Sequence, residues 1–145
     1  MAALHDSLIT GYSVDGEARE LVLRTKPDNG VGGHFDVRFT DVVAYHLEGD
    51  CLQNILSEIL EVPGETVMRD AEVAARNLEY GWPPSWEPGC ETLPQFVARA
   101  GARVFELTCS YGMGGWVAAR TMTVVPRGEG AAQPAVAAEG ASPRR

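Results

Sequence analysis

Three histidines stand beside carboxylates, an arrangement that supplies a general base in many enzymes. The pairs are His5-Asp6, His34-x-Asp36 and His46-x-Glu48. On a strand, His34 and Asp36 share one face about 7 Å apart, since each residue advances the chain by about 3.3 Å. No Ser or Cys in a nucleophile-elbow sequence accompanies any of them, so a catalytic triad lacks its first member. We interpret the pairs as polar contacts, in which Arg24 or Arg38 is an equal partner for Asp36.

The cysteines and the glycine-rich segments do not have the spacing of a metal or phosphate site. Cys51, Cys90 and Cys109 are far apart, with no CxxC motif and no histidine at ligand spacing. Gly30-x-Gly32-Gly33 precedes a predicted strand and Gly112-x-Gly114-Gly115 joins two, whereas a phosphate loop opens a helix. The carboxylates lack the alternating order of a calcium loop. We therefore expect buried reduced thiols, no metal and no cofactor.

Negative charge is concentrated in residues 41–91. The chain has a net charge of −8, and this segment holds eleven carboxylates against two arginines, a balance of −9. Such a field repels nucleic acid and anionic lipid and favours a basic partner. We therefore predict a basic protein partner and no binding to nucleic acid or membranes. The carboxylates predicted to contact this partner are Glu58, Glu61, Glu65, Asp70 and Glu72.

A solvated helical surface is the alternative interpretation of these carboxylates. Glu65→Arg69 and Glu72→Arg76 are i, i+4 pairs in the orientation that stabilises an exposed helix. Two of the eleven carboxylates are neutralised in this way, and the others lack a local counter-ion. Both interpretations stay open at this point.

A proline-rich loop after the acidic segment carries two tryptophans, Trp82 and Trp86. Its prolines fix φ and remove backbone donors, which excludes regular structure. Aromatic loop residues beside charge are typical of an interface hot spot. We include both tryptophans among the predicted partner-binding residues, with capping of the core from outside as the alternative.

Alternating apolar residues predict strands in both ends of the chain. In the first third they cover residues 8–14, 20–25 and 34–45, with a turn at Asp15-Gly16, a loop over 27–33 and a bulge or turn at Thr40-Asp41. In the last part they cover 105–109 and 116–125, joined by a glycine-rich hairpin loop over 111–115.

The middle of the chain has helical spacing. Leu52, Ile55, Leu56, Ile59 and Leu60 follow the i, i+3, i+4, i+7, i+8 pattern, after Asp50 as N-cap and Gln53 completing a capping box. This predicts a helix that ends at Pro63-Gly64. Further helices are predicted over 66–79 and from Thr92 to Gly101, with Pro94 in the first turn.

The resulting order, β-β-β-α-α-α-β-β, predicts an α+β domain with a mostly antiparallel sheet and helices packed on one face. The domain is predicted over residues 1–126. Residues 127–145 are rich in Ala, Gly, Pro and Glu, and predict a disordered tail.

Several fragments resemble small bacterial immunity-type proteins that neutralise toxins of interbacterial competition systems. They are Asp6-Ser7…Gly11-Tyr12, Phe39-x-x-Val42-x-x-Tyr45-His46, Asn54-Ile55-Leu56 and Gly114-Gly115-Trp116-Val117-x-Ala119. The resemblance covers residues 5–125. It implies a compact, non-catalytic acidic protein that covers a basic, nuclease-like surface, and it identifies no binding residue.

The function expected from the sequence is therefore non-catalytic binding of a basic protein, such as a toxin nuclease domain. A cytoplasmic location is expected, because no apolar run approaches the ~20 residues that cross a bilayer and the first residues lack signal-peptide features. The alternatives are a small enzyme using the region of His34, Asp36 and His46, and a housekeeping or scaffold subunit.

Overall fold

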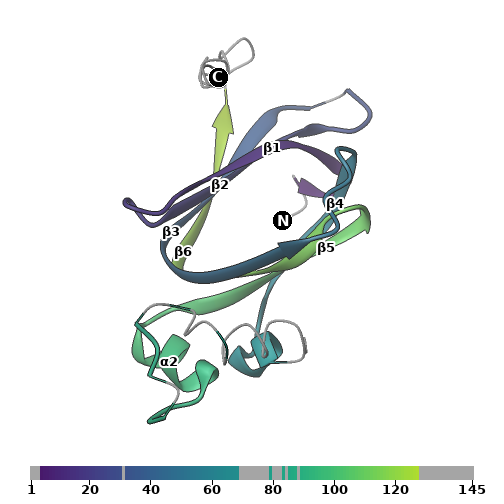
Figure 1. The fold of residues 1–145 in the computed structure, drawn as a ribbon. Helices are drawn as coiled ribbons and strands as arrows, with labels where there is room; N and C mark the ends of the chain where they lie inside the picture. The colour runs from purple at the N-terminus through teal and green to yellow at the C-terminus, as the bar shows by residue number, and fades with distance from the viewer. Residues whose placement is uncertain are drawn as a thin grey trace, which may run out of the picture.

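The computed structural model describes residues 4–30, 32–68, 79, 83, 85–87 and 89–127. Antiparallel strands close into a barrel in the order β1-β2-β3-β6-β5-β4, and β4 pairs back with β1 (Figure 1). The strands are β1 (Ser7–Asp15), β2 (Glu20–Pro27), β3 (His34–Glu48), β4 (Asn54–Val62), β5 (Arg103–Tyr111) and β6 (Gly114–Arg127). Between β4 and β5 lie the 3-10 helix η2 (Gly64–Met68) and the helix α2 (Leu93–Arg99).

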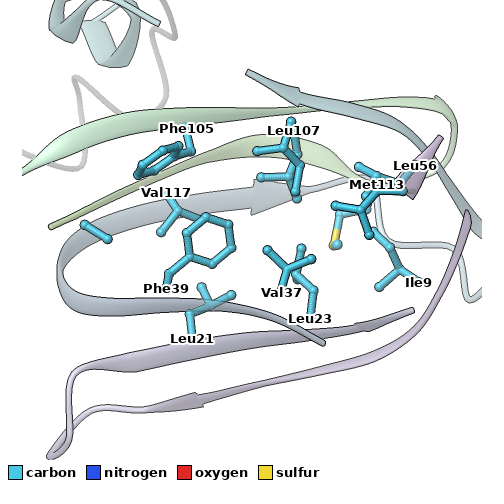
Figure 2. Packing of buried hydrophobic residues seen from close by; sticks show 13 residues of the cluster. Ile9, Leu21, Leu23, Val37, Phe39, Leu56, Phe105, Leu107, Met113 and Val117 are labelled. Atoms are coloured by element: carbon cyan, nitrogen blue, oxygen red, sulfur yellow. The ribbon is translucent and has the colours of Figure 1, made fainter. Parts of the chain in front are cut away.

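Apolar side chains fill the barrel interior. Alternate residues of each strand point inward, and Figure 2 shows them meeting between the two walls of the barrel. Phe39 from β3 and Phe105 from β5 pack with their ring centroids 5.8 Å apart. We call this group the interior cluster; its members include Ile9, Leu21, Leu23, Val37, Leu56, Ile59, Leu107, Met113 and Val117.

A second apolar cluster lies outside the barrel, beneath α2. Leu93, Phe96 and Val97 of α2 pack with residues of β3, β5 and β6 whose side chains face away from the interior: Ala44, Val104, Trp116 and Ala118. Val67 of η2 and Trp86 complete this α2 cluster. The helical segment therefore lies over one end of the barrel wall, as Figure 1 shows below the strands.

Strand β3 bends sharply and forms part of both walls of the barrel. Residues 35–40 pair with β2, and β3 continues along β6 as far as Glu48. At the bend Asp41 has a φ of 53°, and the register with β6 shifts between Val42 and Ala44. The sequence predicted a bulge or turn at Thr40-Asp41, and the bulge lies just after it, between Val42 and Ala44, where it increases bending locally.

The predicted α+β architecture is wrong, and residues 50–62 show why. They form a loop and strand β4 in place of a helix. The register with β5 shifts between Leu56 and Glu58, so one extra residue enters β4. Leu56 and Ile59 both point into the barrel although they are three positions apart, which is the spacing expected of a helix. A bulged strand therefore imitated helical periodicity.

The other predicted elements have mixed outcomes. Thr92 caps α2, and its hydroxyl and Gln95 form the capping box, so the third helix is confirmed. The predicted strands and the Asp15-Gly16 turn are confirmed as well. Of the second predicted helix, 66–79, the structure describes the last part of η2 and Glu79, and residues 69–78 lie outside the described part. β6 extends through Arg127, and residues 128–145 also lie outside it.

No helix in the described part of the chain is long and apolar enough to cross a membrane.

Candidate interaction surface

The structure places the histidine–carboxylate pairs apart from one another. His34 pairs with Arg127 at one end of the β3–β6 ladder, and His46 pairs with Trp116 toward its other end. Asp36 Oδ1 lies 3.4 Å from Arg127 Nη1, a partner other than Arg24 or Arg38. His46 is buried, and its Nε2 lies 3.0 Å from Glu48 Oε1. His34, Asp36 and His46 therefore do not converge on one site.

Metal ligands do not gather in the residues that the structure describes. In that part of the chain no group of three His, Cys, Asp or Glu side chains could hold an ion. The three cysteines are unpaired: Cys51 and Cys90 are exposed, and Cys109 is half-buried. Burial raises the pKa of the Cys109 thiol to about 11, which keeps it protonated at neutral pH.

Three of the predicted partner-binding carboxylates lie on the surface of β4 and η2. Glu58 and Glu65 are exposed, and Glu61 is held by Arg103, whose Nη1 lies 3.1 Å from Glu61 Oε1. Arg103 also lies over the Phe105 ring, 5.2 Å from its centroid. Asp70, Glu72 and Trp82 lie outside the described residues.

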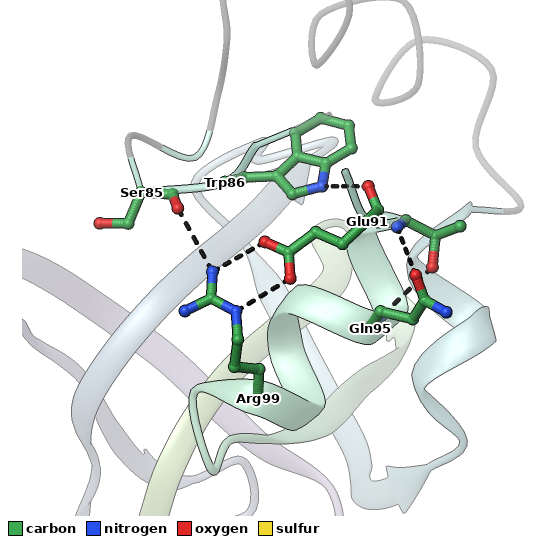
Figure 3. Close-up of polar contacts among 6 residues, drawn as sticks. Ser85, Trp86, Glu91, Gln95 and Arg99 are labelled. Atoms are coloured by element: carbon green, nitrogen blue, oxygen red, sulfur yellow. Dashed lines mark hydrogen bonds and ion pairs between the residues drawn. The ribbon is translucent and has the colours of Figure 1, made fainter. Parts of the chain in front are cut away.

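Trp86 lies in the α2 cluster, which is the core-capping position that the sequence left open. Its side chain is buried, and its indole N–H donates to the carbonyl of Glu91 at 3.0 Å (Figure 3). The Glu91 carboxylate accepts from Arg99 Nε and Nη2 at 2.9 and 2.7 Å. Arg99 therefore lowers the pKa of Glu91, and Glu91 raises that of Arg99. These contacts join Trp86 and Glu91 to α2.

Carboxylates from three strands border one region of the barrel's outer face. Glu106 of β5 pairs with Leu60 of β4 on one side and with Trp116 of β6 on the other. Glu58 lies two residues before Leu60, and Glu48 lies two residues after the partner of Trp116 on β3. No Arg or Lys of the described residues lies within 4 Å of Glu58 or Glu106. We call Glu48, Glu58 and Glu106 the acidic outer face.

The loop between β3 and β4, residues 49–53, was missed by sequence reasoning as a surface feature. Asp50 was predicted as a helix N-cap, and its Oδ1 does accept from the Leu52 N–H at 3.0 Å. However, Asp50 Oδ1 also accepts from the Asn54 amide at 3.0 Å, which turns the chain into β4. The available signal was Gly49-Asp50 followed by Asn54, three residues that favour turns over helices.

This loop is locked to the β5–β6 hairpin. Asn54 is 3% exposed, and its Oδ1 accepts from the backbone N–H groups of Met113 at 2.8 Å and Cys51 at 3.3 Å. Gly112 has a φ of 88°, and a Cβ there would collide with the Asn54 side chain. Only glycine therefore permits this close approach. We call residues 49–53 the leucine loop, because Leu52 is its exposed centre.

A small pocket lies between the β1–β2 turn and the bend of β3. Its volume is about 210 Å³, and apolar residues dominate its lining: Val14, Val42, Val43, Ala44 and Tyr45. Of its charged lining residues, Asp15 accepts from two backbone N–H groups of the turn, and Glu20 pairs with Arg38 at 2.7 Å. The volume is below the roughly 300–1,000 Å³ of typical small-molecule sites, so it suits a side chain better than a cofactor.

The chain matches no protein-family model, and no curated protein and no solved structure matches it. The surface of the molecule is therefore the source of evidence for its function.

Proposed function

We propose that this protein is a non-catalytic binding protein whose acidic outer face binds a basic protein. The observation that carries the proposal is the position of Glu48, Glu58 and Glu106 around one region of the barrel wall. Carboxylates on neighbouring strands repel one another, and a cationic surface relieves this repulsion. Neutralisation of a toxin domain, such as a nuclease with a basic surface, is the form of binding that the sequence resemblance implies.

A cytoplasmic location is part of this proposal. The three cysteines are free thiols, as is usual in a reducing compartment. A partner that arrives in the cytoplasm with a basic surface would meet a chain with a net charge of −8. Long-range attraction of this kind accelerates association more than it increases final affinity.

The test begins with capture of partners on immobilised protein and identification of what is retained. For a captured basic protein, we expect the association rate constant to fall about tenfold or more between about 50 and about 300 mM salt, because salt screens the attraction. The double variant Glu58→Lys/Glu106→Lys, at two carboxylates without an ion pair among the described residues, should slow association strongly at low salt and retain its fold.

The matched control is Glu17→Lys/Asp41→Lys, which changes the net charge equally at two exposed positions, the β1–β2 turn and the bend of β3, where Glu20 pairs with Thr40. If both double variants lower the association rate constant equally, the partner responds to the net charge of the protein alone. An acidic captured partner would contradict the proposed function. So would an association rate constant that is unchanged by salt and by both double variants.

A further inference from the structure

Leu52 is exposed and strained at the same time. Its exposure is 94%, the highest among the exposed large apolar residues of the described chain, and its φ is 73°. A bulky residue with left-handed φ is unfavourable, because its Cβ lies too close to the following carbonyl oxygen. Strain of this kind persists only where the surrounding structure imposes it, and it concentrates at functional positions.

The surrounding structure does impose this conformation. Asp50 Oδ1 accepts a hydrogen bond from the Leu52 N–H, and the Asn54 side-chain amide donates a second hydrogen bond to the same oxygen. Tyr12 of β1 adds a longer hydrogen bond, from its hydroxyl to Asp50 Oδ2 at 3.4 Å. Because Asn54 is buried and bonded to the β5–β6 hairpin, the leucine loop is held by three separate parts of the barrel.

Half-exposed apolar residues lie on the neighbouring strands. In the ladder register Leu8 of β1 pairs with Ile55 of β4, and Ile55 pairs with Tyr111 of β5. Cross-strand partners share a face, and this face is the outer one because Ile9 and Leu56 point inward. Tyr111 is 57% exposed. The apolar row therefore spans three strands beside the start of β4, two residues after Leu52.

The charges around this row are mainly negative. Asp50 lies two residues before Leu52, Glu48 ends β3, and Glu58 follows Ile55 on β4. Hydrogen bonds from the Asn54 amide, the Leu52 N–H and Tyr12 lower the pKa of Asp50, so it is ionised at neutral pH. Lys26 pairs with Leu8 at the far end of the row and is the one cation in this register.

We infer that Leu52, with the Leu8–Ile55–Tyr111 row, is the apolar centre of the surface that binds the basic partner. The inference rests on the proposed function and adds the chemistry of the partner: an apolar socket or side chain ringed by Lys or Arg. Charge complementarity selects this occupant, since Glu48, Asp50 and Glu58 flank the apolar centre. A rigid anchor loses little conformational entropy on binding, which favours affinity.

Two synthetic peptides serve as probes. The mixed peptide alternates Lys or Arg with Leu and Phe, and the basic peptide has Gly in place of each Leu and Phe. By fluorescence anisotropy at low salt, we expect the mixed peptide to bind about tenfold more tightly, the gain that a buried apolar anchor gives. Leu52→Ser should remove this preference and leave binding of the basic peptide unchanged.

Val125→Ser is the matched control, because Val125 is an exposed apolar residue near the opposite end of β3, where it pairs with Asp36. It should leave the preference intact. If both peptides bind equally and Leu52→Ser changes nothing, the anchor is overturned while the proposed function stands. If neither peptide binds and Glu58→Lys/Glu106→Lys does not slow association with the captured partner, the proposed function fails and this inference fails with it.

Sedimentation of the protein alone tests a different occupant. We expect a single species across the concentration range. A dimer that dissociates in the Leu52→Ser variant would assign this surface to a second copy of the chain and overturn the inference.

Discussion

We call Trp86, Glu91 and α2 the α2 corner. The α2 corner and the leucine loop have similar polar contacts, but these contacts accompany a buried apolar side chain in the first region and an exposed one in the second. At the α2 corner, the Glu91 carbonyl and carboxylate hold Trp86 and Arg99, and the aromatic ring is buried (Figure 3). At the leucine loop, the buried Asn54 donates to the exposed Asp50, and the apolar Leu52 faces solvent. In the first region the polar groups lie at the edge of an apolar cluster. In the second, the buried Asn54 and the exposed Asp50 hold the backbone of an exposed apolar residue.

The two regions differ in how much their apolar side chains contribute to the stability of the fold. Burying aromatic and aliphatic side chains stabilises a domain by roughly 25 cal/mol for each Å² removed from water. The α2 corner gains from this effect, and Leu52 gains almost nothing from it. The α2 corner is explained by folding, whereas the proposed binding of a partner would account for an exposed leucine with left-handed φ. Four predictions test this contrast.

The largest expected effect is at the α2 corner. Phe96→Ala removes a buried ring of the α2 cluster and should lower the free energy of unfolding by about 3–5 kcal/mol. Urea denaturation followed by tryptophan fluorescence measures this loss. Leu52→Ala is the control and should change stability by less than about 0.5 kcal/mol, since exposed side chains contribute little. Equal losses in both variants would refute the contrast.

The next effect is at the support of the leucine loop. Asn54→Ala leaves the N–H groups of Met113 and Cys51 without their acceptor and should cost about 2 kcal/mol. Gln53→Ala, at the exposed neighbouring position, should remain within about 0.5 kcal/mol of the wild type. Faster hydrogen exchange at the Met113 amide in the Asn54 variant alone would locate the damage. Unchanged exchange there would mean that Asn54 does not hold the hairpin.

A smaller effect of opposite sign is expected at Leu52. Leu52→Gly relieves the left-handed strain, and glycine also increases the entropy of the unfolded chain, so a net gain of about 0.5 kcal/mol should remain. The measurement is the thermal midpoint, with Leu52→Ala as the control that retains a Cβ and the strain. A glycine variant less stable than the alanine variant would show that φ at this position is not strained.

The smallest effect is a pH dependence. The pKa of Asp50 is lowered in the folded state, so its contribution to stability is present above the unperturbed value of 3.8 and is lost as pH falls through the lower folded pKa. Asp50→Asn should therefore flatten the decline of the urea midpoint below pH 4 relative to the wild type. Glu91→Gln should do the same in its own range, because its pKa is also lowered. Parallel curves for wild type and Asp50→Asn would contradict the role of the Asn54 contact.

Local signals in the sequence identified several elements correctly. The alternation in both ends of the chain predicted strands, and Thr92 with Gln95 predicted the start of α2, because a capping box is formed within four residues. Asp50 was predicted to cap a helix with Gln53, but its side chain accepts from the N–H of Leu52 in a loop that leads into β4. Side-chain contacts of this kind occur at helix starts and in turns alike. The element that followed Asp50 was therefore not decided by that contact.

The candidate surface depended on the fold far more strongly. Glu48, Glu58 and Glu106 come from three strands, and only the strand order brings them to one face. The sequence did indicate that residues 41–91 carry an excess of negative charge and that Glu58 was a candidate. It could not indicate that Glu106 joins it, since β5 lies more than forty residues later in the chain.

The sequence by itself determined composition, charge, the β1–β2 turn, the β5–β6 hairpin loop and the strands at the two ends of the chain, because these depend on neighbours along the chain. The tertiary structure decided the barrel, the conversion of 50–62 from predicted helix to β4, and the exposure of Leu52. Pairing with β1 and β5 satisfies the backbone of β4, and the bulge after Leu56 directs Ile59 back into the interior. Such pairing is non-local, so residue spacing within the segment cannot reveal it.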